Sequence, residues 1–171
     1  LFSLIENLLT WSGIQSGKID FMPQTVPLQG QVENVLRLFS SNAEQKQIHL
    51  QSGLKEPCHV YADVNMLDTV LRNLVSNALK FTPKGGRITI SIAPMTDGGL
   101  MMSVRDTGPG IPKEEITKVM QAFGQGSLAH ETAEGGTGLG LPIVIYLPPF
   151  YAEELGLGLT AVGSIFMITR F

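Results

Sequence analysis

Two asparagines lie one helical turn apart in RNLVSNALKF, residues 72–81, a stretch with the apolar spacing of a buried helix. Asparagine is a poor helix former because its side-chain amide competes for backbone hydrogen bonds. At about 100° per residue, Asn73, Asn77 and Lys80 project about 120° away from the centre of the apolar arc. They form a polar edge beside a buried face, where amide oxygens and an ammonium group could bind a ligand; a solvated helix edge is the alternative. The arc itself consists of Leu67, Val70, Leu71, Leu74, Val75 and Ala78.

A carboxylate ends a predicted strand in DTGPGIP, residues 106–112. Gly108 and Gly110 follow it, and glycines let the backbone approach a flat ligand closely. An ionised Asp106 accepts hydrogen bonds and donates none, so it would suit a base edge that carries an amino group, such as adenine, and reject the carbonyl of guanine. Turns also favour Asp, Thr and Gly, so an ordinary turn is the alternative.

A third stretch, GGTGLGL at residues 135–141, places four glycines just before an apolar helix that is predicted to start near residues 138–140. Backbone amides at the positive end of a helix can bind phosphate oxygens. The stretch is not a P-loop, because no Lys-Ser/Thr pair follows, and it is not a strand-first G-x-G-x-x-G motif. A flexible glycine linker is the alternative.

Helices and short strands must position these three stretches. Besides the one at the third stretch, helices are predicted over residues 28–46, 64–81 and about 113–121, the first with a buried stripe of Val32, Val35, Leu36, Phe39 and Ala43. Strands are predicted over residues 48–52, 59–63, 87–94, 100–106 and 164–171, the third and fourth as an antiparallel pair. No regular strand–helix–strand alternation is present, which favours an α+β fold. We therefore expect a two-layer α/β sandwich with a mixed, mostly antiparallel sheet and its helices on one face.

The amino-terminal residues follow a different pattern. Residues 1–12 carry a helical stripe without a start signal, and Gly, Ser and Pro interrupt the pattern over residues 13–27. We place a domain boundary near residues 18–21 and expect the chain to be a piece of a longer protein.

Composition excludes several classes of protein. The net charge is −3 and no basic run is present, so nothing favours nucleic acid. No apolar run approaches the about 20 residues that span a bilayer, so we expect no membrane contact. Cys58 is the single cysteine, which suits a reducing compartment.

Four stretches together resemble the ATP-site boxes of sensor histidine kinases: NLVSNALKFTPKGG, VRDTGPGIP, FGQGS and GGTGLGLPIV. The resemblance extends over about residues 1–145 and implies the Bergerat ATP-binding fold of the GHKL ATPases. It also implies that residues 1–20 are the end of a dimerisation and phosphoacceptor helix with its linker, and that residues 21–171 are the catalytic ATP-binding domain. The family's pattern does not extend over residues 145–162, where Pro148 and Pro149 interrupt the expected helix.

The resemblance implies a role for each residue of the polar helix edge. Asn77 would give its side-chain oxygen to the Mg²⁺ that bridges the ATP phosphates, a hard ion that takes few protein oxygens beside phosphate and water. Asn73 would lie against the phosphates, Lys80 would neutralise phosphate charge, and Phe81 would flank the nucleotide.

The glycine-rich stretches would complete the site, again by resemblance. Asp106 would accept a hydrogen bond from the adenine amino group. The wall beside the base would consist of Gly108, Gly110 and Ile111. The phosphates would be contacted by Gly136, Thr137, Gly138, Leu139 and Gly140. Residues 123–135 would form a lid over ATP.

The residue at position 73 bears on the reaction. ATPases of this fold carry a glutamate four residues before the metal-binding asparagine, where it activates water, whereas an amide cannot act as a general base. We therefore expect transfer of the γ-phosphoryl group to a histidine outside this chain, so the chain alone would not phosphorylate itself. The expected partners are its own dimerisation and phosphoacceptor domain and a response regulator, in the cytoplasm. The alternatives are a GHKL-type ATPase or serine-kinase relative, and a degenerate module that binds no nucleotide.

Overall fold

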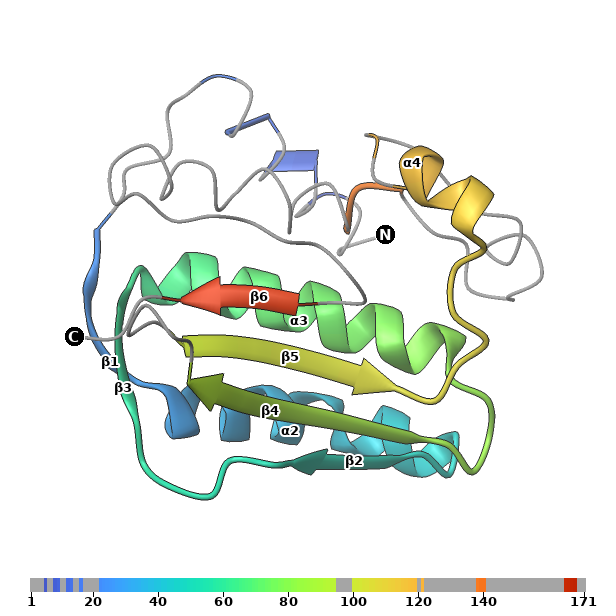
Figure 1. The fold of residues 1–171 in the computed structure, drawn as a ribbon, viewed down its shortest axis with the longest axis horizontal. Coiled ribbons are helices and arrows are strands. Elements are labelled where there is room, and N and C mark those ends of the chain that lie inside the picture. Colours follow the sequence, from blue (N-terminus) through green and yellow to red (C-terminus); the bar gives the residue numbers. More distant parts are fainter. Residues whose placement is uncertain are drawn as a thin grey trace.

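Two helices pack against one face of a four-stranded sheet in the computed structural model (Figure 1). The structure describes residues 22–94, 100–119, 121, 138–140 and 165–168, together with residues 5, 8–9, 12–13 and 16. The strands are β1 Gln24–Pro27, β2 His49–Ser52, β3 His59–Ala62, β4 Arg87–Pro94, β5 Leu100–Asp106 and β6 Ile165–Ile168. The helices are α2 Leu28–Gln45, α3 Val64–Phe81, the 3₁₀ turn η1 Lys113–Glu115 and α4 Ile116–Val119.

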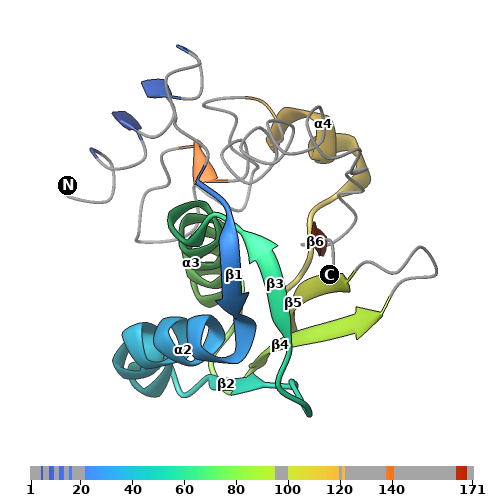
Figure 2. The same ribbon diagram turned by 90° about the vertical axis from the view of Figure 1, so that its left-hand side faces the viewer.

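The four-stranded sheet has the order β2-β4-β5-β6 and is mixed. β2 runs parallel to β4, whereas β4–β5 and β5–β6 are antiparallel pairs. Strands β1 and β3 form a separate antiparallel pair, which Figure 2 shows lying across the end of the helical layer. The predicted α+β sandwich, with a mostly antiparallel sheet and helices on one face, is confirmed.

The core lies between the sheet and the two long helices. Alternate residues of β4 and β5 are buried, as in a sheet with one covered face. The predicted apolar arc of α3 is buried along its whole length, and Leu71 and Val75 are fully inaccessible. Burying a side chain of this kind contributes about 1.5–3 kcal/mol. These contacts fix the rotation of α3 about its own axis, and so fix where its polar edge lies.

The first turn of α3 is capped by a buried carboxylate. Asp63 Oδ1 accepts hydrogen bonds from the backbone N–H of Asn65 at 2.9 Å and of Met66 at 3.1 Å. Its other oxygen, Oδ2, accepts from the N–H of Met22 at 2.9 Å. Asp63 therefore fixes the start of α3 and ties it to the segment that enters β1.

The last turn of α3 is held by the end of α2. Lys46 Nζ donates a hydrogen bond to the carbonyl oxygen of Leu79 at 3.0 Å, which satisfies one of the carbonyls that a helix leaves unpaired at its carboxyl end. α2 itself ends with Gln47 in the left-handed region at φ 54°, and Ile48 N–H donates to Ala43 O at 2.8 Å. This is a Schellman ending with glutamine where glycine is usual.

The sequence patterns missed one element, β1. We expected residues 13–27 to be irregular because of their Gly, Ser and Pro content. Instead, Gln24–Pro27 pairs with β3, and Val26 is 1% exposed. Pro27 is tolerated because it is the last residue of a strand and directly precedes α2.

The other expected elements agree with the structure where it describes them. Helices over residues 28–46 and 64–81 are confirmed, as are the strands, and the short helix near residues 113–121 begins as a 3₁₀ turn. Most of the predicted helix at residues 1–12, the lid and residues 145–162 lie outside the described residues. None of the described helices is both long enough and apolar enough to cross a membrane.

We predict that Asp63→Ala lowers the free energy of unfolding by about 2–3 kcal/mol, because it removes a helix cap and leaves buried N–H groups unpaired. Urea denaturation followed by circular dichroism measures this change. Asp68→Ala is the matched control, since the Asp68–Arg72 pair at 2.7 Å is partly exposed and is expected to contribute no more than about 0.5 kcal/mol. Equal stability of the two variants would contradict the capping role.

Candidate functional site

The polar edge of α3 lies against the third glycine-rich stretch. A Cβ placed on Gly140 would lie 3.1 Å from Asn73 Oδ1 and 3.3 Å from Asn77 Nδ2. Both asparagines are half-buried, and Gly138 has a φ of 68°, a conformation that favours glycine. The structure thus brings together two stretches separated by more than sixty residues, at a distance that admits no side chain at position 140 without movement.

Hydrogen bonds along α3 orient the first asparagine. Asn73 Nδ2 donates to the carbonyl oxygen of Thr69 at 2.8 Å, and Thr69 Oγ1 donates in turn to the carbonyl of Asn65 at 2.8 Å. With its N–H₂ group used in this way, Asn73 turns its oxygen toward Gly140. Asn73 therefore presents an acceptor toward Gly140, whereas the Asn77 amide has its Nδ2 nearer to the added Cβ than its Oδ1, at 3.3 Å and 3.6 Å. Amide oxygens are also ligands for a hard cation.

The carboxylate at the end of β5 is held by the turn that follows it. Asp106 Oδ1 accepts a hydrogen bond from the N–H of Gly108 at 2.7 Å. A Cβ placed on Gly108 would lie 2.7 Å from that oxygen and 3.0 Å from the carbonyl oxygen of Phe81. The end of α3 and the turn after β5 are therefore in direct contact. Among the described residues, no hydrogen bond is made to the second carboxylate oxygen, Oδ2, which leaves it for a ligand.

Lys80 and Phe81 are the last two residues of α3, so they follow Asn77 along the helix, and Phe81 faces the turn at Gly108. The Lys80 Nζ atom lies 5.1 Å from the centroid of the Phe81 ring, which is within the range of a cation–π contact. Both side chains are half-buried. A cation in the last turn of α3 lies one turn or less from Asn77, on the same polar edge.

The remaining predicted site residues fall into three groups. Gly110 has a φ of 75° and open space around it, and Ile111 is 46% exposed. Leu139 is fully buried, so any ligand contact from this residue would come from its backbone. Gly136 and Thr137 lie outside the described residues. In the part of the chain that the structure describes, no group of three or more His, Cys, Asp or Glu side chains could hold a metal ion.

Sequence patterns missed one residue of this region, Thr82. It ends α3, it is 4% exposed, and it follows Phe81 directly. A threonine after a helix is an unremarkable sequence feature, and its burial results from how the end of α3 packs in the folded chain. No local pattern could have found it.

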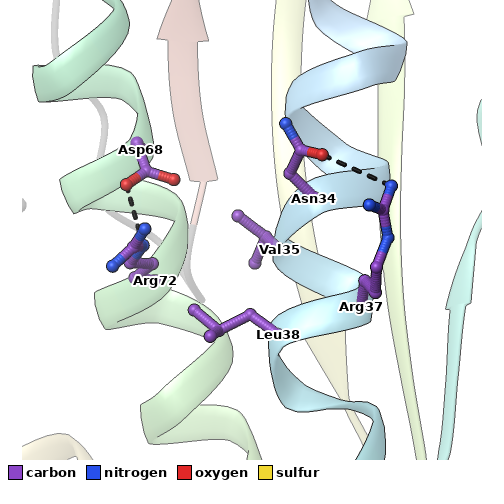
Figure 3. Close-up of a pocket in the computed structure, with 6 residues that line it drawn as sticks. All are labelled: Asn34, Val35, Arg37, Leu38, Asp68 and Arg72. Carbon is purple, nitrogen blue, oxygen red and sulfur yellow. Dashed lines mark hydrogen bonds and ion pairs between the residues drawn. The ribbon is translucent and has the colours of Figure 1, made fainter.

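A groove of about 280 Å³ lies elsewhere, between α2 and α3 (Figure 3). It is lined by Asn34, Val35, Arg37, Leu38, Asp68 and Arg72. The charged groups are already engaged, because Arg72 pairs with Asp68 and Arg37 donates to Asn34 Oδ1 at 3.4 Å. None of the predicted site residues lines this groove, so it is separate from the asparagine edge.

Comparison with known proteins assigns the family. Residues 62–164 match the family described as histidine kinase-, DNA gyrase B- and HSP90-like ATPases. The chain belongs to this family. The match includes α3, β4, β5 and the glycine-rich stretch, which are the elements that meet at the site.

The relatives of known name include histidine kinases. The chain is 34% identical over 146 residues to the non-motile and phage-resistance protein of Caulobacter vibrioides, an alignment of 84% of this chain and 17% of the relative. It is 31% identical over 152 residues to the cell-division control histidine kinase PdhS of Brucella anthropi, with 84% of this chain and 14% of the relative covered. The chain thus spans less than a fifth of either relative.

Solved structures agree with this assignment. Full-length ShkA in complex with AMPPNP superposes with a TM-score of 0.75 and 27% identity, over 97% of this chain and 34% of that chain. The catalytic domain of the histidine kinase ThkA superposes with a TM-score of 0.66 and 27% identity, over 89% of this chain and 97% of that chain. The predicted identity, an ATP-binding catalytic domain of the histidine kinase type, is confirmed. The individual site residues are not tested by these comparisons and stay predictions.

We predict that Gly108→Ala weakens binding of an ATP analogue at least tenfold, because the new methyl group displaces the Asp106 carboxylate from its hydrogen bond with residue 108. Isothermal titration calorimetry gives the affinity. Gly30→Ala in α2 is the matched control, since Gly30 is not a predicted site residue and an added Cβ there meets no described atom within 4 Å; it is expected to leave the affinity unchanged. Wild-type affinity in Gly108→Ala would show that this turn does not position the carboxylate.

Proposed function

We propose that this chain binds Mg-ATP along the polar edge of α3 and serves as the catalytic domain of a sensor histidine kinase, transferring the γ-phosphoryl group to a histidine outside the chain. The observation that carries the proposal is that both halves of the site meet one helix. Gly140 contacts Asn73 and Asn77, and the Asp106–Gly108 turn contacts Phe81. Four residues of helix separate Asn77 from Phe81, a rise of about 6 Å, which a single nucleotide can bridge.

Each residue of the proposed site has a chemical task. Asp106 would bind the adenine amino group through Oδ2, since Oδ1 is engaged by Gly108. Asn77 would give its amide oxygen to Mg²⁺, which the ATP phosphates bind as well and which holds them in position. Lys80 would offset phosphate charge, and glycines 136, 138 and 140 would contact the phosphates through backbone N–H groups.

The amide of Asn73 supports phosphoryl transfer over hydrolysis. Its N–H₂ group is bound to Thr69 O, and its oxygen has no proton-accepting strength comparable to that of a carboxylate. A domain of this kind positions ATP and stabilises charge, while the acceptor imidazole acts as the nucleophile. Such an acceptor would be brought by the dimerisation and phosphoacceptor domain.

We assign residues 1–20 to the end of that domain and residues 21–171 to the catalytic domain. The described apolar residues of the amino-terminal segment support this assignment, because Ile5, Leu8 and Leu9 are 48%, 41% and 69% exposed. Exposed apolar side chains at helical spacing are typical of a surface that packs on a partner helix. A response regulator would then receive the phosphoryl group, in the cytoplasm.

We expect Asp106→Asn to weaken binding of AMPPNP more than tenfold. Gly108 N–H would retain the amide oxygen of the new side chain, so its N–H₂ group would face the amino group of adenine, donor against donor. Discrimination against GTP should fall as well. Calorimetry with both nucleotides tests this, and equal ATP affinity in wild type and variant would refute adenine recognition by this residue.

The metal role of Asn77 predicts a loss that depends on magnesium. Asn77→Ala should reduce the Mg²⁺-induced gain in ATP affinity by about tenfold or more, and leave binding in EDTA nearly unchanged. Asn65→Ala, an exposed asparagine in the first turn of α3, is the control. Steady phosphate release by the isolated chain that is lost in Asn73→Ala would instead favour an ATPase.

A further inference from the structure

The chain leaves the β4–β5 ladder one residue after Asp106. The regular register of the two strands ends with the pair Ile88–Asp106. At the next position Thr107 N–H still donates to Arg87 O at 3.1 Å, as the ladder requires. The reciprocal bond is different, because Arg87 N–H donates at 3.0 Å to the side-chain oxygen of Thr107, Oγ1. In a regular antiparallel pair the acceptor would be the backbone carbonyl of residue 107.

The hydroxyl of Thr107 thus takes the place of a backbone acceptor at the point where the chain turns. The backbone can leave the sheet after this residue while Arg87 N–H stays paired. Gly108 N–H then returns to Asp106 Oδ1 at 2.7 Å, which is an Asx turn. The two bonds between Thr107 and Arg87 hold the middle residue of the Asp106–Gly108 turn on β4, so they set where the N–H of Gly108 lies relative to the carboxylate.

The connection between α3 and β4 lies on the other side of this hydroxyl. A Cβ placed on Gly86 would lie 2.8 Å from Thr107 Oγ1 and 2.9 Å from Pro83 O. Gly86 is itself held by β2, since its carbonyl oxygen accepts a hydrogen bond from His49 N–H at 2.9 Å. The Thr107 hydroxyl therefore lies between two backbone segments of fixed position. Valine has the shape of threonine but offers no acceptor there, whereas serine keeps the acceptor.

We propose that Thr107 is a positioning residue of the nucleotide site, and that its hydroxyl holds the Asp106–Gly108 turn in the conformation that binds the base. This inference rests on the proposed function, because Thr107 acts through Asp106 and contacts no ligand itself. Anchoring of the turn on Arg87 keeps Gly108 N–H on Oδ1 and so directs Oδ2 of Asp106 toward the adenine amino group. Without the anchor, binding would have to order the turn, and that cost lowers the affinity.

Calorimetry with Mg-AMPPNP on whole-chain variants tests the proposal. Thr107→Val should bind about three- to fivefold more weakly than wild type, whereas Thr107→Ser should stay within about twofold. Thr89→Val is the matched control, since it removes a hydroxyl that accepts from Gln51 Nε2 at 3.2 Å on strand β4, and it should leave the affinity unchanged. Wild-type affinity in Thr107→Val, or an equal loss in Thr107→Ser, would overturn the proposal.

The amide resonance of Gly108 reports on the turn without any nucleotide. In ¹H–¹⁵N spectra of the nucleotide-free chain, this resonance should move in Thr107→Val, because its hydrogen bond with the carboxylate changes, and should stay near its wild-type position in Thr107→Ser. A purely structural contribution of Thr107 would lower the urea midpoint and leave both this resonance and the affinity unchanged. That result would overturn the positioning role.

A double variant separates this inference from the proposed function. If Thr107 acts through Asp106, Thr107→Val combined with Asp106→Asn should bind about as weakly as Asp106→Asn alone. A loss equal to the product of the two single losses would overturn the route through the carboxylate. If Asp106→Asn weakens binding and Thr107→Val does not, only the inference about Thr107 fails. If the wild-type chain does not bind AMPPNP, the proposed function fails, and the ligand role of Thr107 fails with it.

Discussion

Burial of one face of α3 is the constraint on which the rest of this molecule depends. Eight of its side chains are buried, and each of the seven that are Leu, Val or Met contributes about 1.5–3 kcal/mol if fully transferred from water. The loss of helix propensity at two asparagines is well below about 1 kcal/mol each, so the apolar face easily offsets it. The buried face thereby fixes the rotation of the helix and holds the asparagines half-buried. At such a position an amide can bind a ligand and does not require a hydrogen-bond partner inside the core.

Position along the helix axis is fixed separately, by polar contacts at its two ends. Asp63 caps the first turn, and Lys46 and the N–H of Thr82 bind carbonyls of the last turn. The axial position matters because Gly108 and Gly140 approach α3 so closely that a Cβ added at either would lie 3.0–3.1 Å from an oxygen of the helix. A shift of α3 by a fraction of an ångström would open or close the approach of Phe81 to Gly108.

Local patterns predicted the elements well and the contacts poorly. The bounds of α3 and its buried arc followed from a 3.6-residue period, which the structure keeps without interruption. β1 was not predicted because a four-residue strand that ends in proline has almost no periodic signal. The closeness of Gly140 to Asn73 is a tertiary contact that no periodicity encodes, and it was expected only through resemblance to a family. Thr82 is buried by the packing of the folded chain, so its burial too had no local signature.

The hydrogen bonds of Asn73 show that an amide at this position does more than remove a general base: it also sets the direction of the side chain. Thr69 and Asn73 each donate a side-chain hydrogen bond to the carbonyl four residues earlier, which forms a short ladder along the polar edge of α3. A carboxylate has no proton to donate, so glutamate could not make the bond to Thr69 O and would be repelled by that carbonyl. Glutamate would have to extend away from the helix, toward the space where a water could be activated. Asparagine instead stays folded against its own helix with its oxygen outward. The residue type thus changes both the acid–base chemistry and the direction of the side chain, and we expect both changes to oppose hydrolysis.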